Sequence, residues 1–411
     1  MKENIGVMGR LRLLRLLGVL GVLGVLGCSD DSELDHRQRV TFEAQPCATA
    51  FVQEEEVSEA RPVGTMGTTR AWTPPETPIK YYLYTDEKVN GLFVGQKNLF
   101  YKSIDVFFTS NGSEPQHGTF SYKESESKWR LDMDINETAN YNVYGYIPKE
   151  VANSASITGN SSYSDGAVLT IQGIKTVTHS DLCVIVGAKD GLSDSDDNGL
   201  TTGQFSVNAQ RVQLNSDGTT TGGHNYIYLL FDHLYSALAF NFTIDATYYT
   251  LRTIKLRKLE LIGYEDNNET NIKARYNVVV KLKSNTTGAS PIKEVTFTPD
   301  PTSGDLAFEP IYEDSGSGLE LNPNTPTDFM GCFVPGQNTF FKLRTTYDVY
   351  DKKGNLIREG CEAENTIDLR KKFSISESLC GQMFKITVNV QPTYLYVLSE
   401  PDLDNPTLKI Q

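Results

Sequence analysis

The sequence predicts an all-β protein with two strand-rich halves, and three observations support this prediction. The 411-residue chain contains 21 Tyr and 19 Phe, and aromatic residues favour strands, as do the Thr, Val and Ile that recur in short runs. Several segments alternate apolar and polar residues with a period of two, which is typical of half-buried antiparallel strands. A stretch rich in Gly, Ser, Thr, Asp and Asn at 190–223 indicates a long loop at a domain boundary.

Length and charge limit the class of protein. The composition is globular, with 39% hydrophobic and 22% charged residues, and the length predicts two or three domains. The formal net charge of −14 argues against nucleic acid as a partner, because such binding depends on Lys and Arg contacts to phosphate. The same charge suits a soluble, self-repelling surface protein.

The first 27 residues have the pattern of a signal peptide. Arg10, Arg12 and Arg15 supply a positively charged start, and a run of Leu, Val and Gly follows at 16–27. That run is shorter than the roughly 20 apolar residues that a membrane span usually needs, so it indicates a signal peptide instead. Cys28 at its end resembles the Cys of a bacterial lipobox. An ordinary signal peptide that contains a Cys is the alternative.

Lipidation of Cys28 would hold the protein on a membrane, because each buried CH₂ of an acyl chain such as palmitate contributes about 0.8 kcal/mol. The next three residues, Ser29, Asp30 and Asp31, resemble the acidic export signal of Bacteroidetes surface lipoproteins. The resemblance implies a location on the outer face of the outer membrane, with the lipid as the anchor.

Residues 28–70 are predicted to form a tether or pro-segment. The stretch is polar and acidic, and it contains a strand-like patch at 40–43. Prolines at 74, 75 and 78 follow it, and they suit an extended entry into the first domain because proline cannot continue a helix.

The first half of the chain, 71–223, is predicted to contain one strand after another. In 129–135 the apolar residues Trp129, Leu131, Met133 and Ile135 alternate with polar ones, which predicts a half-buried antiparallel strand. The other strands are expected at 81–84, 106–108, 141–148, 167–171 and 182–186.

The second half, 224–390, has the same character. Leu238, Phe240 and Phe242 are spaced to lie on one face of a strand. Gly354 stands where a hairpin turn needs a positive φ. Strands are expected at 226–231, 233–242, 254–262, 276–282, 295–297, 339–343, 347–350, 355–358 and 384–390.

The tail at 391–411 stays apolar and prone to form strands after Pro392. Its apolar residues include Tyr394, Tyr396 and Leu398, and then Leu408 and Ile410. A free end of this kind is an aggregation hazard. The tail therefore needs a partner, which is either its own sheet or another molecule.

Nothing in the sequence selects an enzyme, a metal or a cofactor. The segment 194–199 matches the first half of a calcium loop, but Phe205 replaces the Glu at the twelfth position, so a solvated acidic turn is favoured. The five His show no H-E-x-x-H spacing, and no nucleophile elbow or phosphate loop is present. His233 is expected to be a structural histidine with hydrogen-bond partners. A glycosidase with two carboxylates is the enzymatic alternative.

Cysteine usage does not predict a disulfide scaffold, because six Cys are few for a chain of this length. With Cys28 lipidated, five of the six remain, so at least one is unpaired in the uncut chain. Buried free thiols are the favoured interpretation.

Several weakly specific motifs, in this order, resemble the fimbrillin-like family of Bacteroidales, the lipoprotein subunits of type V pili, over most of the chain after the leader. They are the lipobox with its acidic residues, the Thr-Arg-Ala step at Arg70, Tyr-x-Val-Tyr-x-Tyr-x-Pro at 141–148, Phe-x-His-x-x-Ser-x-Leu-x-Phe at 231–240 and Tyr-x-Val-x-Asp-x-x-Gly at 347–354. The resemblance implies two tandem transthyretin-like β-sandwiches, which are Ig-like Greek-key domains, at 71–223 and 224–390.

The resemblance also implies a function in a pilus stalk, tip or anchor. In stalk subunits of the family an Arg-specific protease removes the lipidated segment with its first strand, and a neighbour's C-terminal segment fills the groove. Here this implies cleavage between Arg70 and Ala71. The candidate donor residues are Tyr394, Tyr396, Leu398, Leu408 and Ile410. The implied partners are other pilus subunits, in a homo- or heteropolymer, and a host or bacterial adhesion ligand. The alternative is an uncleaved surface lipoprotein that acts as an anchor, a tip or a carbohydrate- or protein-binding adhesin.

Overall fold

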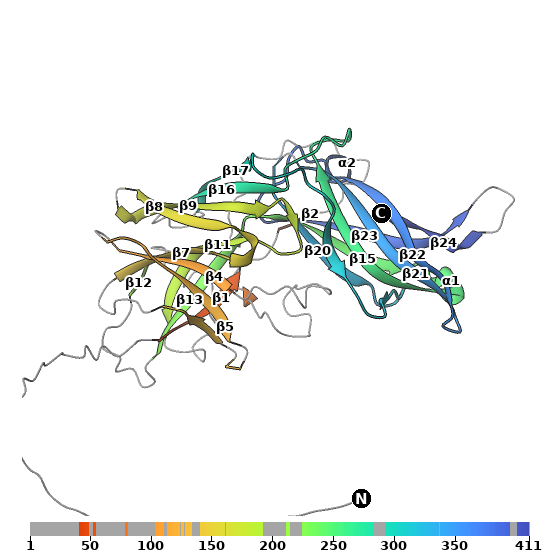
Figure 1. The fold of residues 1–411 in the computed structure, drawn as a ribbon, viewed down its shortest axis with the longest axis horizontal. Coiled ribbons are helices and arrows are strands. Elements are labelled where there is room, and N and C mark those ends of the chain that lie inside the picture. Colours follow the sequence, from red (N-terminus) through yellow and green to blue (C-terminus); the bar gives the residue numbers. More distant parts are fainter. Residues whose placement is uncertain are drawn as a thin grey trace, which may run out of the picture. The chain divides into compact units, whose positions relative to one another are not determined.

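The structure, a computed structural model, describes residues 41–48, 52–54, 79–80, 103–110, 113–123, 125–126, 128–133, 140–160, 162–191, 211–213, 224–282, 292–336, 338–394 and 401–410. All of them belong to one compact unit, Arg39–Gln411. Within these ranges the chain is nearly all strand, and its strands form four sheets (Figure 1).

The first sheet has nine strands and is built mainly from the first half of the chain. Its pairing order is β11-β13-β1-β6-β5-β4-β7-β12, β3 pairs with β1, and β11 also pairs with β7, so the sheet curls back on itself. The strands are β1 (Thr41–Ala48), β3 (Ile79–Lys80), β4 (Ser103–Thr109), β5 (Gln116–Lys123), β6 (Lys128–Leu131), β7 (Asn140–Ile147), β11 (Cys183–Gly191), β12 (Arg211–Gln213) and β13 (His224–His233).

A four-stranded sheet covers one face of the first sheet and completes the first sandwich. Its order is β17 (Ile292–Pro299), β16 (Arg275–Leu282), β9 (Ser162–Lys175) and β8 (Ser154–Asn160). One apolar cluster joins Leu169 and Val278 of this sheet to Tyr144 and Tyr228 of the first sheet. A second cluster, which includes Trp129 and Leu229, lies on the other face of the first sheet.

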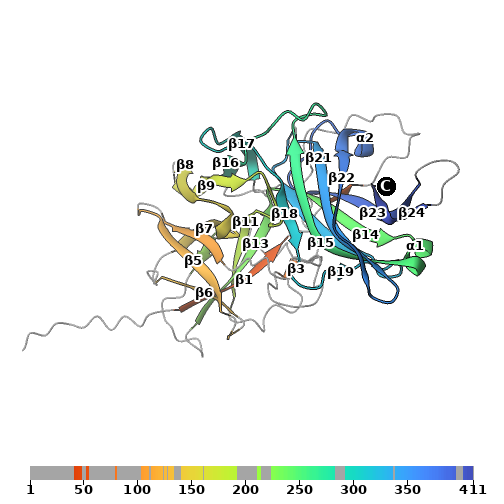
Figure 2. The same cartoon turned by 45° about the vertical axis from the view of Figure 1, so that its right-hand side comes forward.

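Two further sheets form the second sandwich. One has the order β10 (Val177–Thr178), β20 (Thr327–Phe333), β14 (Ser236–Ile244), β23 (Gln382–Tyr394) and β2 (Val52–Glu54), and β24 (Pro401–Ile410) also pairs with β23. The other has the order β18 (Glu309–Glu313), β15 (Arg252–Tyr264), β21 (Phe340–Asp351) and β22 (Leu356–Asp368), and β19 (Leu319–Glu320) pairs with β15. Figure 2 shows these sheets from a second direction.

The alternating pattern predicted for β14 is confirmed. Leu238, Phe240 and Phe242 are fully buried in the core of the second sandwich. Ala237 and Ala239, on either side of Leu238, are also buried, but in the cluster that fills the first sandwich. Small alanines on one face and large apolar side chains on the other therefore let β14 contact both cores. The predicted fold class, all-β with two β-sandwiches, is confirmed.

The predicted hairpin near Gly354 is confirmed as well. Strand β21 ends at Asp351 and β22 begins at Leu356, and Gly354 has a φ of 86°, where a side chain would be strained. The carboxylate of Asp351 accepts hydrogen bonds from the backbone N–H groups of Lys353 and Asn355, both at 2.8 Å. The side-chain amide of Asn355 is the main cause of the lowered pKa of Asp351.

Strand β6 is shorter than predicted. It ends at Leu131, whereas the alternating pattern extends to Ile135, which lies outside the described residues. Trp129 and Leu131 are buried in the second cluster of the first sandwich, and Met133 packs against them, so the predicted apolar face is correct where it is described.

Sheet membership does not change at residue 224. Strand β13 pairs with β11 in the first sheet, and β9 of the first half pairs with β16 of the second half. The predicted ranges 71–223 and 224–390 stay a prediction, as does the acidic turn at 194–199, which lies outside the described residues.

Helices are few among the described residues. They are α1 (Ala246–Leu251), α2 (Leu369–Phe373) and the short 3₁₀ helix η2 (Lys149–Val151). Asp245 caps α1 by accepting a hydrogen bond of 2.8 Å from the backbone N–H of Tyr248. In the part of the chain that the structure describes, no helix is long and apolar enough to cross a membrane.

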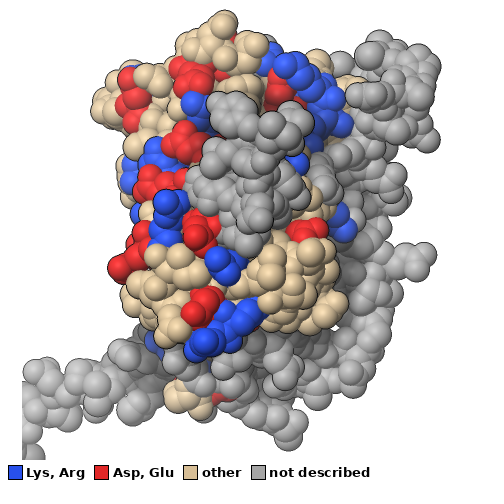
Figure 3. Space-filling model, turned by 90° about the vertical axis from the view of Figure 1, so that its right-hand side faces the viewer, with Lys and Arg blue, Asp and Glu red and all other residues tan. Residues whose placement is uncertain are grey.

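The surface carries charges of both signs. On the face shown in Figure 3, acidic and basic side chains are interspersed. Ion pairs of this kind include Arg344–Glu364 at 2.7 Å and Lys281–Glu294 at 2.9 Å. Such exposed pairs contribute little to stability, about 0–1 kcal/mol each, so burial of the apolar clusters holds the sandwiches together.

Candidate assembly site

The strand before Arg70 is an internal strand of the first sheet. Strand β1 pairs in parallel with β13 over its whole length, from Thr41 opposite His224 to Ala48 opposite Phe231. Its other edge pairs antiparallel with β6 and β3. The patch predicted at 40–43 therefore lies at the start of a real strand, although Val40 itself is outside the described residues.

Burial of Ala44 fixes the register of this strand. Ala44 is 3% exposed and belongs to the same cluster as Trp129 and Ile227. Because side chains alternate along a strand, a slip of one residue would turn Ala44 out of the cluster. Loss of β1 would uncover backbone N–H and C=O groups on both neighbouring strands, and such exposed edges invite pairing with another chain.

A second piece of the same segment reaches the second sandwich. Strand β2 pairs in parallel with the start of β23, with Val52 opposite Gln382 and Glu54 opposite Phe384. Cleavage at Arg70 would thus separate two strands from the rest of the chain, β1 in the first sandwich and β2 in the second.

The C-terminal tail has its own sheet as its partner. Strand β24 pairs antiparallel with the far end of β23, with Leu408 opposite Val390 and Ile410 opposite Val388. Leu408 is 4% exposed and belongs to the core of the second sandwich, and Ile410 packs against that core. The sequence predicted that the tail pairs either with a sheet of its own chain or with another molecule. In the structure it pairs with a sheet of its own chain.

Polar contacts also hold β24 in place. The Tyr347 hydroxyl donates a hydrogen bond of 3.0 Å to the backbone carbonyl of Pro406. The guanidinium of Arg252 donates twice to Asp404 Oδ1, from Nε at 3.0 Å and from Nη2 at 2.8 Å. These contacts come from β21 and β15 of the facing sheet, so β24 is tied to both layers of the second sandwich.

Of the other predicted site residues, the structure describes the backbone of Tyr394 alone. Tyr394 is the last residue of β23 and pairs with Pro401. The lipidation, export, cleavage and other donor residues lie outside the described residues: Cys28, Ser29, Asp30, Asp31, Arg70, Ala71, Tyr396 and Leu398. Their roles stay predictions.

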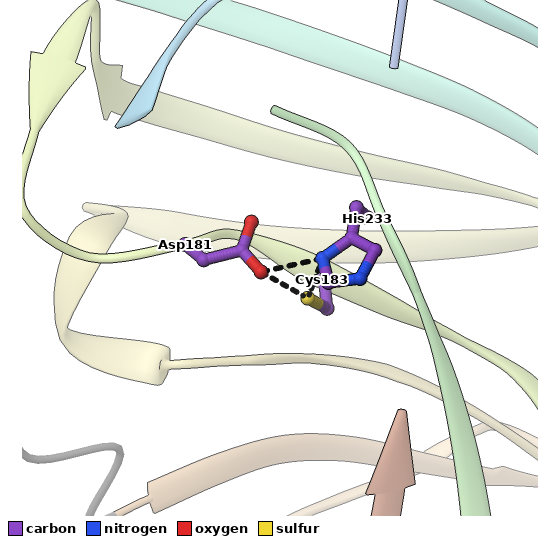
Figure 4. A group of neighbouring side chains, drawn as sticks. All are labelled: Asp181, Cys183 and His233. Carbon is purple, nitrogen blue, oxygen red and sulfur yellow. Dashed lines mark hydrogen bonds and ion pairs between the residues drawn. The ribbon is translucent and has the colours of Figure 1, made fainter. Parts of the chain in front are cut away.

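One buried polar cluster was not predicted from the sequence. Nδ1 of His233 lies 2.6 Å from Oδ2 of Asp181, and Sγ of Cys183 lies 3.1 Å from that oxygen and 3.4 Å from Nδ1 (Figure 4). The expectation that His233 has hydrogen-bond partners is confirmed. Asp181 and Cys183 were missed because they are 52 and 50 residues away in sequence, and no local pattern connects them to His233.

The cysteines fit the expectation of buried thiols. Cys183, Cys332, Cys361 and Cys380 are all present as thiols, and the first three are buried. Burial raises the pKa of Cys332 well above its usual range and also raises the pKa of Cys361. Both therefore stay protonated at neutral pH, and a protonated thiol is a poor nucleophile.

Comparisons with known proteins found similar solved structures but no sequence match. No protein-family model and no curated protein matches the chain. A candidate cell adhesion protein from Bacteroides fragilis is similar at 8% identity and a TM-score of 0.37, with 90% of this chain and 97% of that chain covered. One from Bacteroides uniformis has 12% identity, a TM-score of 0.32 and coverage of 91% and 97%.

A third similar structure is the fimbrial anchor protein Mfa2 from Porphyromonas gingivalis. Its identity is 8% and its TM-score 0.25, with 90% of this chain and 97% of that chain covered. At TM-scores below 0.5 the likeness carries no argument for function by itself.

Proposed function

We propose that this protein is a structural subunit of a cell-surface pilus. In this proposal it is exported as a lipoprotein through Cys28, is exposed on the outer membrane, and supports adhesion. Protease cleavage after Arg70 triggers its assembly by strand exchange with other pilus subunits. The observation that carries the proposal is β1, an internal strand of the first sheet whose covalent link to the other strands runs through the segment containing Arg70.

The energetics of strand exchange suit this arrangement. The ladder of β1 with β13 runs through eight residues, and each backbone hydrogen bond contributes about 1 kcal/mol net. An incoming strand restores those bonds and buries apolar side chains at about 1.5–3 kcal/mol apiece. This is the general physics of strand addition to an open sheet edge.

The test is polymer formation after limited trypsin treatment, followed on unboiled gels. Wild-type protein should give a ladder of polymers. Arg70→Ala should stay monomeric because β1 remains covalently attached. Arg61→Ala is the matched control, since Arg61 precedes Pro62 in a poor context for cleavage, and it should polymerise like the wild type. Ladders from Arg70→Ala would contradict cleavage at this site.

The docked tail favours a second candidate function. Leu408 in the core and the contacts of Arg252 and Tyr347 hold β24 on its own sheet, so the tail must detach before it can enter another subunit. A subunit that keeps its tail is suited to an end position in the pilus, as an uncleaved anchor or tip, or to a role as a carbohydrate- or protein-binding adhesin. A wild type that is cleaved yet never forms ladders would favour this second function.

A further inference from the structure

The cluster of Asp181, Cys183 and His233 lies where the chain passes twice between the sandwiches. Residues 179–182 connect β10 of the second sandwich to β11 of the first, and residues 234–235 connect β13 of the first to β14 of the second. A backbone hydrogen bond of 2.8 Å from Leu234 to Leu182 holds the two connections side by side. Asp181 lies on the first connection, and Cys183 and His233 are the strand residues next to the two connections.

The three side chains converge because of the local strand geometry. Cys183 and His233 face each other across the β11–β13 ladder, so their side chains lie on one face of the sheet. Asp181 precedes Cys183 by two residues, and its carboxylate points back to both of them (Figure 4). Exposed fractions are 3% for Asp181, 0% for Cys183 and 4% for His233.

We propose that Asp181, Cys183 and His233 bind a Zn²⁺ ion that fastens the two connections together. A carboxylate oxygen, a thiolate and an imidazole nitrogen are the donor types that zinc takes in proteins. The three ligand atoms all lie within 4.8 Å of one another. These three atoms would occupy three of the four positions of a tetrahedral zinc site.

The distances suit zinc after a small movement. Zinc bonds of about 2.0–2.3 Å place tetrahedral ligand atoms roughly 3.4–3.6 Å apart. The Sγ–Nδ1 distance of 3.4 Å already fits, and the Sγ–Oδ2 distance of 3.1 Å is close. Only the Oδ2–Nδ1 distance of 2.6 Å must widen on zinc binding.

Charge balance favours a divalent ion at this place. Coordination requires that Sγ of Cys183 and Nδ1 of His233 carry no proton, so the thiol proton leaves and the imidazole keeps its proton on Nε2. Zn²⁺ with one thiolate, one carboxylate and a neutral imidazole has zero net charge. A neutral assembly avoids the large cost of an unbalanced charge in a buried site.

The test is metal content together with cobalt spectroscopy. Because the cluster is buried, the tag-free full chain is expressed with Zn²⁺ or Co²⁺ in the medium, so that the metal is present during folding. The wild type should retain one Zn²⁺ per chain through dialysis. With Co²⁺ it should show a thiolate-to-cobalt charge-transfer band in the ultraviolet.

Two cysteine variants locate the site. Cys183→Ser should lose the charge-transfer band and bind Zn²⁺ at least about 10-fold more weakly, since even indirect changes around a metal cost 10–100-fold. Cys361→Ser is the matched control, because Cys361 is also buried but belongs to the core of the second sandwich, and it should keep both properties.

Two outcomes would overturn the proposal. One is a folded wild type that retains no zinc and shows no charge-transfer band with cobalt. This result can be interpreted without any variant. The other is loss of metal from Cys361→Ser to the same extent as from Cys183→Ser. Circular dichroism of each protein establishes that the chains compared are folded.

Discussion

Nδ1 of His233 lies 2.6 Å from Oδ2 of Asp181, and this contact joins the end of β13 to the loop that precedes β11. Both side chains are almost fully buried, at 5% and 3% exposure. In such surroundings a polar group is costly unless it has its partner. Keeping this contact therefore favours the packing of the loop at 179–182 against the end of β13.

Removing one partner of this pair should destabilise the protein strongly. Asp181→Ala leaves a buried imidazole without its hydrogen-bond partner, and we expect a loss of about 1–3 kcal/mol in the free energy of unfolding. Asp404→Ala is the control: its pair with Arg252 is half-exposed and should contribute at most about 1 kcal/mol. Urea unfolding measures both, and equal losses would contradict the role given to Asp181.

The tail should behave as part of the second sandwich. Leu408→Ala removes a buried side chain from the core, and we expect a cost of about 2–5 kcal/mol. Its neighbour Lys409 is exposed, so Lys409→Ala should change stability by less than about 0.5 kcal/mol. If Leu408→Ala were as harmless as Lys409→Ala in thermal unfolding, the tail would not be docked in solution.

Local patterns predicted much of this fold. The alternation of Leu238, Phe240 and Phe242, and the glycine at 354, are features of single segments, and each corresponds to the expected strand face or turn. Long-range pairings have no such local signal. Strand β1 forms a parallel ladder with β13. This pairing depends on whether β13 has an edge free of other strands, and the residues around Thr41 carry no pattern that identifies β13 as the neighbour.

The candidate sites were predictable to different degrees for the same reason. The apolar residues of the tail predicted that it packs against a partner. Leu408 is buried, as this prediction requires. The choice between its own sheet and another molecule depends on tertiary contacts such as that of Tyr347 with Pro406. The cluster at His233 needs residues from β13 and from the loop before β11, so only the folded chain brings it together.

The hairpin turn at 351–354 should depend on pH. Hydrogen bonds from Asn355 lower the pKa of Asp351 below its usual value of 3.8, and the bond from the Asn355 side chain has the largest effect. A lowered pKa in the folded state means that the ionised carboxylate stabilises the protein above pH 3.8, and this contribution is lost as the pH falls through the lowered value. We expect Asn355→Ala to destabilise at pH 7 and to match the wild type near pH 2. A difference that is independent of pH in denaturant titrations would contradict this.

Burial of Ala44 makes β1 sensitive to a single charge. Ala44→Asp places a carboxylate in an apolar cluster and should cost more than about 2 kcal/mol. Ala246→Asp is a matched control, because Ala246 is exposed in the first turn of α1, where an acidic residue is favourable. Melting temperatures that fall equally in both variants would show that β1 is not an internal strand.

Complementation by peptides should separate strand exchange from an end position in the pilus. A chain that starts at Ala71 lacks β1 and β2, and we expect it to aggregate because the edges of β13 and β6 are open. A peptide of the β1 sequence, Thr41–Ala48, should restore a soluble monomer, and a scrambled peptide should not. If the tail acts as a donor, a peptide of residues 394–411 should rescue the chain as well, since it supplies the same backbone bonds and its own apolar side chains. Rescue by the β1 peptide alone would leave the tail as a permanent strand of its own sandwich, and the anchor or tip function would then be the better explanation.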